Sequence, residues 1–293
     1  MTDRFPVAII GVGNMGGAMA LNLLARGWEV HVHDIVAERR DALAAAGARA
    51  HATAATAATQ ATTTIIAVVT ADQARDVLFG TGAVASSVRL GHTVMLCPTM
   101  APADVESMAA QLHPLGVFCV DAPMSGGPVR ARDGSMSLMV ACPEAVFVRQ
   151  APLLQALSTK VFRISERAGD GARTKLVNNL AAAINLAGAA EVLAMAQRMG
   201  LDGGKTLDVI EQSSGQSWIG SDRMRRALAG DYAPRAHMTL LEKDTRLAVQ
   251  AALDAGFVGS LGGVARDIFA NASTSGLAEL DDAALLHWFS REA

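Results

Sequence analysis

A lysine and an asparagine one helical turn apart are the first candidates for chemistry. Lys175 and Asn179 lie at positions i and i+4 of a long apolar segment, so on a helix both side chains project from one face. No other ionisable side chain occurs between Lys175 and Glu191. Partial desolvation in a cleft can lower the pKa of a lysine toward neutrality, which suits general acid/base catalysis. The alternative is a surface lysine whose stem packs on the helix while its charge stays in water.

A glycine pattern near the N-terminus predicts a dinucleotide site. The motif is Gly11-Val12-Gly13-Asn14-Met15-Gly16, which fits G-x-G-x-x-G and follows an apolar run at Phe5–Ile10. The first glycine permits a tight turn, the second lets the backbone approach a pyrophosphate, and the third lets helix and strand pack closely. The helix predicted at Asn14–Arg26 presents its N-terminal N–H groups to the phosphates. Outside this strand–helix context, the motif would be an ordinary glycine turn.

Asp34 ends the next apolar run, Trp28–Asp34, at about twenty residues beyond the first glycine of the motif. A carboxylate there accepts hydrogen bonds from the adenosine ribose and repels a 2′-phosphate, which favours NAD over NADP. Arg39 and Arg40 follow on a predicted helix and could reach such a phosphate, but we expect them to be solvated. NAD is therefore the first choice of cofactor and NADP the second.

The elements around these residues alternate between strand and helix over the first half of the chain. Strands are expected at Phe5–Ile10, Trp28–Asp34, Thr63–Val69, Thr93–Cys97, Val117–Asp121, Met136–Cys142 and Val161–Ile164. Helix-compatible segments separate them, which is typical of a doubly wound parallel sheet of the Rossmann type. An Ala/Thr-rich patch at His51–Thr64 is expected to be a small loop and helix on the surface.

Strand signals end near Ile164–Gly171, and long Ala/Leu-rich helices follow. They are expected at Arg173–Met199, Gly204–Gln212, Ser221–Ala229, Thr239–Ala255 and Gly263–Ser275. The sequence therefore predicts a dinucleotide-binding domain at 1–166 and an all-helical domain at 167–293, joined by a long helix.

Two further candidates follow predicted strands at the edge where open α/β sheets bind ligands. Ser125-Gly126-Gly127 has two successive glycines whose backbone N–H groups can converge on an anion, and the serine adds a hydroxyl donor. We interpret this loop as a carboxylate cradle, with a plain strand-to-helix turn as the alternative. Thr99 follows the strand at Thr93–Cys97.

The overall composition excludes several classes of protein. The formal charge of −3 and the absence of a Lys/Arg run give no reason to expect nucleic-acid binding. Cys97, Cys119 and Cys142 form no CxxC, and the seven histidines show no ligand spacing, so no metal is indicated. Met1–Phe5 shows no signal-peptide pattern, and the most apolar stretches are interrupted by polar residues. We expect a cytoplasmic protein with no membrane partner.

Four segments, taken together, resemble the β-hydroxyacid dehydrogenase family, which includes 3-hydroxyisobutyrate dehydrogenase and tartronate semialdehyde reductase. They are Gly11–Gly16 with Met19–Leu23, Asp121–Gly127 with Gly134–Met136, Gly171–Asn179, and Lys243-Asp244 with Leu247-Ala248. Within the family, Ser213–Trp218 and Gly230–Arg235 look most like L-threonate dehydrogenases. Two positions differ from the family pattern: Val68-Val69 before Thr70 replaces Leu-Pro, and Met124 replaces Val.

The resemblance implies a Rossmann-type domain and a helical domain with the active site in the cleft between them, in a homodimer or homotetramer. It implies that Lys175 is the acid/base of an enzyme acting on a small hydroxy acid, with Asn179 orienting the substrate and Ser125-Gly126-Gly127 holding its carboxylate. Thr99 and Lys243 would contact the nicotinamide end of the cofactor. Further cofactor contacts are expected at Val69 and Thr70, and a substrate contact at Trp218.

Purely structural roles remain open for Lys243 and Trp218, and other functions remain open for the protein. Lys243 could be an exposed helix lysine paired with Asp244 or Glu242, and Trp218 could be a core residue. An imine reductase would replace the catalytic lysine, so Lys175 argues against that class. A non-catalytic dinucleotide-binding module should lack the lysine or carry basic extensions. A sugar-phosphate decarboxylating dehydrogenase would need a larger helical domain and basic residues for the phosphate.

Overall fold

A computed structural model describes residues 4–292 of the chain. The residues before Arg4, from which the absence of a signal peptide was predicted, lie outside the described part. Contacts between Cα atoms divide the chain into two compact units, 1–175 and 176–293.

The first unit contains a nine-stranded sheet in the order β3-β2-β1-β4-β5-β6-β8-β7, with β9 also paired to β8. The strands are β1 (Val7–Ile10), β2 (Val30–His33), β3 (Arg49–Ala50), β4 (Thr63–Ile66), β5 (Thr93–Leu96), β6 (Phe118–Asp121), β7 (Met124–Ser125), β8 (Ser137–Ala141) and β9 (Lys160–Ser165). From β3 to β6 all neighbours are parallel. The sheet thus has the topology of a Rossmann-type, doubly wound domain.

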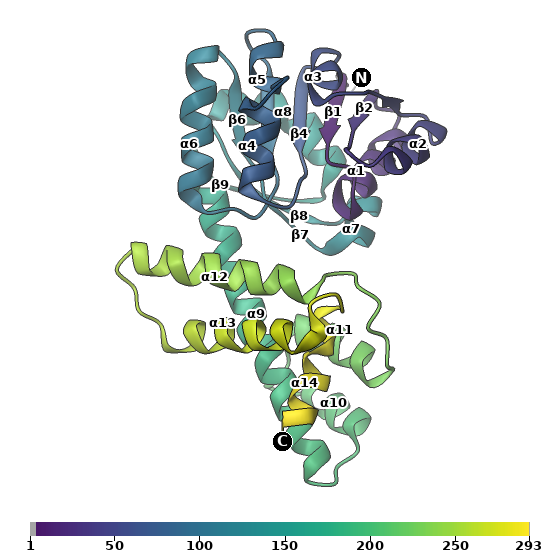
Figure 1. The fold of residues 1–293 in the computed structure, drawn as a ribbon, viewed down its shortest axis with the longest axis vertical. Coiled ribbons are helices and arrows are strands. Elements are labelled where there is room, and N and C mark those ends of the chain that lie inside the picture. The colour runs from purple at the N-terminus through teal and green to yellow at the C-terminus, as the bar shows by residue number, and fades with distance from the viewer. Residues whose placement is uncertain (1–3, 293) are drawn as a thin grey trace. The chain divides into compact units, whose positions relative to one another are not determined.

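Helices cover both faces of this sheet. The helices of this unit are α1 (Asn14–Ala25), α2 (Ala37–Ala45), α3 (Ala54–Thr59), α4 (Ala71–Phe79), α5 (Val84–Ser87), α6 (Pro102–Leu112), α7 (Gly127–Asp133) and α8 (Glu144–Leu157), with a 3-10 turn at His113–Leu115. Side chains alternate along β1, so Val7 and Ile9 pack in a core with α1, α2, α7 and α8. Ala8 and Ile10 pack in a second core with α3, α4, α5 and α6. The helices around the strands can be followed in Figure 1.

The second unit is helical. The long helix α9 (Asp170–Arg198) starts in the first unit and continues into the second, followed by α10 (Gly203–Glu211), α11 (Trp218–Leu228), α12 (Met238–Asp254), α13 (Ser260–Ala272), a π turn (Ser273–Leu277), a 3-10 turn (Asp282–Ala284) and α14 (Leu285–Glu292). Side chains of α9 from Ala183 to Ala194 form its core with Phe269 and Leu285. By length and composition α9 could span a membrane, a test that the core helix of a helical domain also passes.

Four features differ from the sequence prediction or were absent from it. Strand β8 runs antiparallel to β6, so the sheet is mixed at this side. The two-residue strands β3 and β7 and the final helix α14 were not predicted, because they are short or close the chain. The Ala/Thr-rich patch does form helix α3, but Ala57 and Ala58 are fully buried. Their methyl groups are small enough for the helix to pack tightly onto the sheet.

Candidate active site

The turn after β1 has the close packing that the glycine motif predicts. Gly11 has φ +86°, a conformation that L side chains rarely adopt. A Cβ atom added at Gly16 would lie 2.0 Å from the carbonyl oxygen of Gly11, far inside van der Waals contact. Helix α1 can therefore start directly against the end of β1 only with glycine at this position.

The N-terminus of α1 is suited to an anion. Its N-cap residue, Gly13, supplies no side-chain hydrogen bond to the first turn, which has no acidic residue either. A Cβ at Gly13 would meet no atom closer than Nη1 of Arg39, at 3.7 Å. Unlike Gly16, Gly13 thus leaves open space in front of N–H groups that no side chain caps, as a bound pyrophosphate requires. The residues present fit a dinucleotide.

Asp34 follows β2 and joins two loops. One carboxylate oxygen accepts a hydrogen bond from the backbone N–H of Val12 at 2.8 Å, and the other accepts one from Val36 at 2.9 Å. Nη1 of Arg39 lies 3.7 Å from the carboxylate, and Arg40 donates to the carbonyl oxygen of Asp34 at 2.6 Å. The turn that carries Asp34 therefore holds Arg40, contrary to the expectation that this side chain is solvated. Arg39 is 53% exposed, as expected.

Ile35 was missed by the sequence analysis. This residue directly follows Asp34. Its side chain is 91% exposed, which is unusual for an isoleucine. An exposed apolar side chain at this position offers a packing surface for a flat base. The signal in the sequence was the position of Ile35 directly after Asp34. Strand prediction takes no account of such a position.

The loops after β4 and β5 carry Val69, Thr70 and Thr99. Thr70 caps α4 by accepting a hydrogen bond from the N–H of Gln73, whose side chain accepts from the N–H groups of Val69 and Thr70. The backbone donors of Val69 and Thr70 are thus satisfied within the loop, and Val69 presents a half-exposed apolar side chain. Thr99 is half-buried just after β5.

The loop after β6 requires glycine at two successive positions. Gly126 has φ +129° and Gly127 has φ +74°. A Cβ at Gly126 would lie 2.9 Å from Cδ of Arg130, whereas one at Gly127 would meet no atom within 4 Å. Ser125 precedes them on β7 and pairs with Ser137. The backbone therefore turns sharply here and leaves open space beside Gly127, as an anion-binding loop needs.

These loops lie along one edge of the sheet in a fixed order. Because β2, β1, β4, β5 and β6 are parallel neighbours, their carboxyl ends meet at the same edge. The edge carries, in order, Asp34, the glycine loop, Val69 with Thr70, Thr99 and the Ser125-Gly126-Gly127 loop. Four steps of about 4.8 Å span roughly 19 Å. A row of this length can accommodate an extended dinucleotide.

Lys175 lies close to the same edge. Helix α9 begins beside the end of β6, where the Asp121 carboxylate accepts hydrogen bonds from the N–H groups of Gly169 and Ala172 at 2.9 and 3.1 Å. Lys175 follows Ala172 by three residues, about 4.5 Å along the helix axis. Its side chain is only 7% exposed, so the alternative of a solvated surface lysine does not hold.

Asn179 is held by a polar cluster in the second unit. Its amide nitrogen donates to the Asp244 carboxylate at 2.5 Å, and its amide oxygen accepts from Asn178 at 3.0 Å. Nζ of Lys243 lies 2.9 Å from the other Asp244 oxygen. Asp244 was considered only as a pairing partner of Lys243, and the structure shows it also orienting Asn179. Lys243 thus pairs with Asp244, as the structural alternative expected. A contact between Lys243 and the cofactor stays a prediction.

Trp218 starts α11, where Ser217 caps the helix by accepting from the N–H of Gly220 at 3.1 Å. The indole is 53% exposed, so the alternative of a core tryptophan does not hold. Its contact with substrate stays a prediction.

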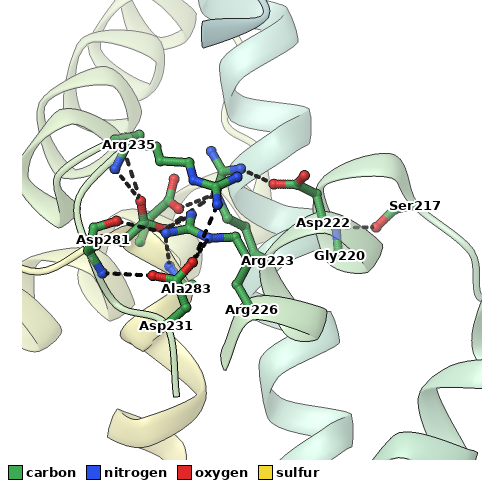
Figure 2. A network of polar contacts seen from close by, with 12 residues as sticks. Ser217, Gly220, Asp222, Arg223, Arg226, Asp231, Arg235, Asp281 and Ala283 are labelled. Carbon is green, nitrogen blue, oxygen red and sulfur yellow. Dashed lines mark hydrogen bonds and ion pairs between the residues drawn. The ribbon is translucent and has the colours of Figure 1, made fainter. Parts of the chain in front are cut away.

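A buried network of charges connects α11 with distant parts of the helical unit (Figure 2). Arg226 donates to Asp231 at 3.1 Å, to Asp281 at 2.8 Å and to the carbonyl oxygen of Ala233 at 2.7 Å. Asp281 also accepts from the backbone N–H groups of Arg235, Ala236 and Ala283. The network thereby joins α11, the segment before α12 and the turn before α14.

Electrostatics explains why this network holds charge. Burial alone would raise the pKa of Asp281, but three backbone N–H groups and Arg226 outweigh it and lower the pKa. Burial raises the pKa of the neighbouring Asp282 to about 7, against the attraction of Arg223, with which it pairs. Asp281 is therefore the stable anion at the centre of the network.

Cys97, Cys119 and Cys142 are free thiols, and burial raises the pKa of each. Within residues 4–292, no three His, Cys, Asp or Glu side chains are grouped to hold a metal ion.

The fold and this row of loops define a nicotinamide-dinucleotide-dependent oxidoreductase. Residues 6–165 match the NAD binding domain of 6-phosphogluconate dehydrogenase, and residues 169–289 match the NAD-binding domain of NADP-dependent 3-hydroxyisobutyrate dehydrogenase. The chain belongs to the β-hydroxyacid dehydrogenase family. It carries out dinucleotide-linked oxidoreduction of hydroxy acids.

Three relatives illustrate the match. The chain is 35% identical to L-threonate dehydrogenase of Escherichia coli O6:H1 over 98% of this chain and 96% of that protein. It is 32% identical to 3-hydroxyisobutyrate dehydrogenase of Pseudomonas aeruginosa, over 92% of this chain and 91% of that protein. The crystal structure of a 3-hydroxyisobutyrate dehydrogenase from Salmonella typhimurium superposes with a TM-score of 0.91 at 35% identity, covering 97% and 100% of the two chains.

The charge network generates a stability prediction with a control on the same helix. Arg226→Met should lower the free energy of unfolding of the helical unit by about 3 kcal/mol, because the buried Asp281 charge loses its hydrogen-bonded guanidinium and keeps only Arg223, at 3.7 Å. Arg225→Met removes a neighbouring arginine that pairs with Asp208 and Glu211 at the surface, and should change stability little. Calorimetric unfolding would compare the two, and equal losses would contradict the prediction.

Proposed function

We propose that the enzyme acts on a short carboxylic acid with a hydroxyl group at C2 or C3, of the 3-hydroxyisobutyrate, glycerate or threonate type. The observation that carries this proposal is the order of loops along the sheet edge. The row starts at the ribose-binding Asp34 and ends at the Ser125-Gly126-Gly127 loop, next to the start of the helix that carries Lys175. A carboxylate-binding loop and a proton-transferring lysine thus follow the nicotinamide end of the row.

Each residue has one task in the proposed mechanism. A nicotinamide dinucleotide held by the glycine loop and Asp34 would supply hydride transfer to or from the carbinol carbon. Nζ of Lys175 takes the hydroxyl proton when the alcohol is oxidised and returns a proton when the carbonyl is reduced. The Asn179 amide, fixed by Asp244, carries a second hydrogen that can orient the hydroxyl oxygen. Ser125 and the N–H groups of Gly126 and Gly127 bind the carboxylate.

The substrate class can be narrowed by the relatives. Several relatives at 32–35% identity over nearly the whole chain are L-threonate dehydrogenases. The segments Ser213–Trp218 and Gly230–Arg235 resemble the same group. The first leads into α11, and Arg226 of α11 binds the second. We therefore place threonate-like acids first among the three types.

NAD remains the proposed cofactor, with NADP second. The Asp34 carboxylate would repel a 2′-phosphate, and both its oxygens are fixed by backbone N–H groups, so it cannot easily turn away. Arg39 weakens this selection, since its half-exposed guanidinium lies beside the carboxylate and could neutralise a phosphate there. The balance between Asp34 and Arg39 would set the preference.

We also propose that the protein is cytoplasmic and forms a homodimer or homotetramer. Exposed apolar side chains gather where α12 turns into α13: Leu253, Phe257, Val258, Leu261 and Val264. Such a concentration on one turn of the helical unit supports burial against another copy of the chain.

The role of Lys175 can be tested by substitution. Lys175→Met should lower kcat by about 10²–10⁴-fold and leave the affinity for reduced cofactor nearly unchanged, because a methionine keeps the apolar stem but transfers no proton. Lys205→Met, at an exposed position of α10, serves as the control. Steady-state kinetics and fluorescence titration with NADH and NADPH provide the measurements. Turnover above a tenth of that of the wild type would exclude Lys175 as the acid/base.

Cofactor preference can be tested through one charge. The wild type should have a higher kcat/KM with NAD than with NADP, and Asp34→Asn should shift the ratio at least 10-fold toward NADP, since Arg39 then faces the 2′ position without a competing carboxylate. Asp41→Asn, on the exposed face of α2, should leave the ratio unchanged. Equal or better use of NADP by the wild type would show that Asp34 does not face the 2′ position.

Substrate analogues test the carboxylate loop. An active hydroxy acid should exceed its amide, methyl ester and simple alcohol analogues in kcat/KM by 10-fold or more, because donors left without a partner cost roughly 1–3 kcal/mol each. The same acid lacking only a distal hydroxyl is the matched comparison. Uncharged analogues that react about as well as the acid would rule out this role for the Ser125-Gly126-Gly127 loop.

A further inference from the structure

Asp121 is a buried acid that the mechanism above does not use. It is the last residue of β6, and its side chain is 1% exposed. The sequence places it at the start of the Asp121–Gly127 segment but gives it no task. A carboxylate is costly to bury, so its retention at this position needs a physical reason.

Its contacts supply that reason. One oxygen accepts hydrogen bonds from both Gly169 and Ala172, which flank the first residues of α9. The first N–H groups of a helix have no partner within the helix and carry partial positive charge. Asp121 therefore caps α9 from a strand about fifty residues earlier in the chain, in the way that a local N-cap residue would.

The close approach of helix and sheet fixes this geometry. A Cβ atom added at Gly171 would lie 2.7 Å from the carbonyl oxygen of Met139 on β8 and 2.9 Å from Cγ of Asp121. The first turn of α9 thus fits against β6 and β8 with no room for a side chain. Lys175 follows Gly171 by four residues, about one turn of helix.

We propose that Asp121 is a positioning residue, which sets the rotation and height of the first turns of α9 and thereby places Lys175 relative to the Ser125-Gly126-Gly127 loop. Both elements depend on it, since the chain runs from Asp121 through Ala122 and Pro123 into β7 and the loop, and the helix starts on its carboxylate. This inference rests on the proposed role of Lys175.

The ionisation of Asp121 adds a second observable. Burial raises its pKa to about 6, and the N–H groups of Ala172, Gly169 and Gly171 limit the rise. The other titratable groups that interact with it are Asp170 and the thiols of Cys97, Cys119 and Cys142, and burial keeps these thiols neutral well above pH 8. The carboxylate, which is the stronger acceptor, forms as the pH rises through about 6. Below that pH the hydrogen bonds that hold the start of α9 should weaken, and Lys175 should be positioned less precisely.

The test uses two substitutions of different severity. Asp121→Asn keeps an acceptor oxygen but loses the charge, and should lower kcat about 10-fold. Asp121→Ala removes the acceptor and should lower kcat about 100-fold, as expected for a misplacement of about 1 Å. Affinity for the reduced cofactor should stay within twofold in both, which also shows that the sheet edge is folded. Asp104→Asn, in the first turn of α6 and paired with Arg75, is the control.

Two readouts separate positioning from general stability. In a Lys175→Met background, Asp121→Asn should cause no further loss of turnover, because there is no lysine left to place. The fall in wild-type kcat below about pH 6 should be absent in Asp121→Asn. An additive loss in the double variant, an unchanged acid limb, or a kcat within twofold of the wild type in both Asp121 variants would overturn the inference. If Lys175→Met itself retained turnover, the proposed role of Lys175 would be wrong. The two failures can be told apart, because that result comes from the Lys175 variant alone and a failure of the Asp121 inference comes from the Asp121 variants.

Discussion

The parallel pairing of β2, β1, β4, β5 and β6 is the constraint on which the candidate site depends. Parallel strands in register must end at a common edge, so five loops that are far apart in sequence become neighbours in a fixed order. Two hydrophobic cores hold this sheet from opposite faces, which leaves its carboxyl edge as the free place for ligands. The chemistry of each loop then follows from its place in the row.

Local signals in the sequence were sufficient for most of the fold. Periodicity and glycine positions predicted seven of the strands, the long helix and the change to an all-helical part, because each such signal acts within a few residues. The same signals identified the glycine loop and Asp34. They gave no warning of the short strands β3 and β7, whose pairing is decided by tertiary context rather than by propensity.

Partners distant in sequence could not be predicted in this way. Asn179 is oriented by Asp244, and Arg226 is neutralised by Asp281, across 65 and 55 residues respectively. A single sequence shows that these residues are polar but not which of them meet. The positions of Arg40 and Ile35 were missed for a related reason: the turn after β2 determines whether a side chain near Asp34 faces solvent or the loop. Polar networks are thus the part of the site that requires a structure.

The glycines of the loop after β1 and of the Ser125-Gly126-Gly127 loop also limit how such an enzyme can diverge. Gly11 and Gly126 have backbone conformations that side chains rarely adopt, and at Gly16 even a methyl group would overlap a carbonyl oxygen. Backbone amides bind a ligand without using a side chain, and few substitutions at these positions are compatible with the fold. New substrate preferences would have to arise at positions that tolerate change, such as the exposed Trp218 and its neighbours. The invariant chemistry and the adaptable specificity of the enzyme would then reside in different segments of the chain, free to evolve at different rates.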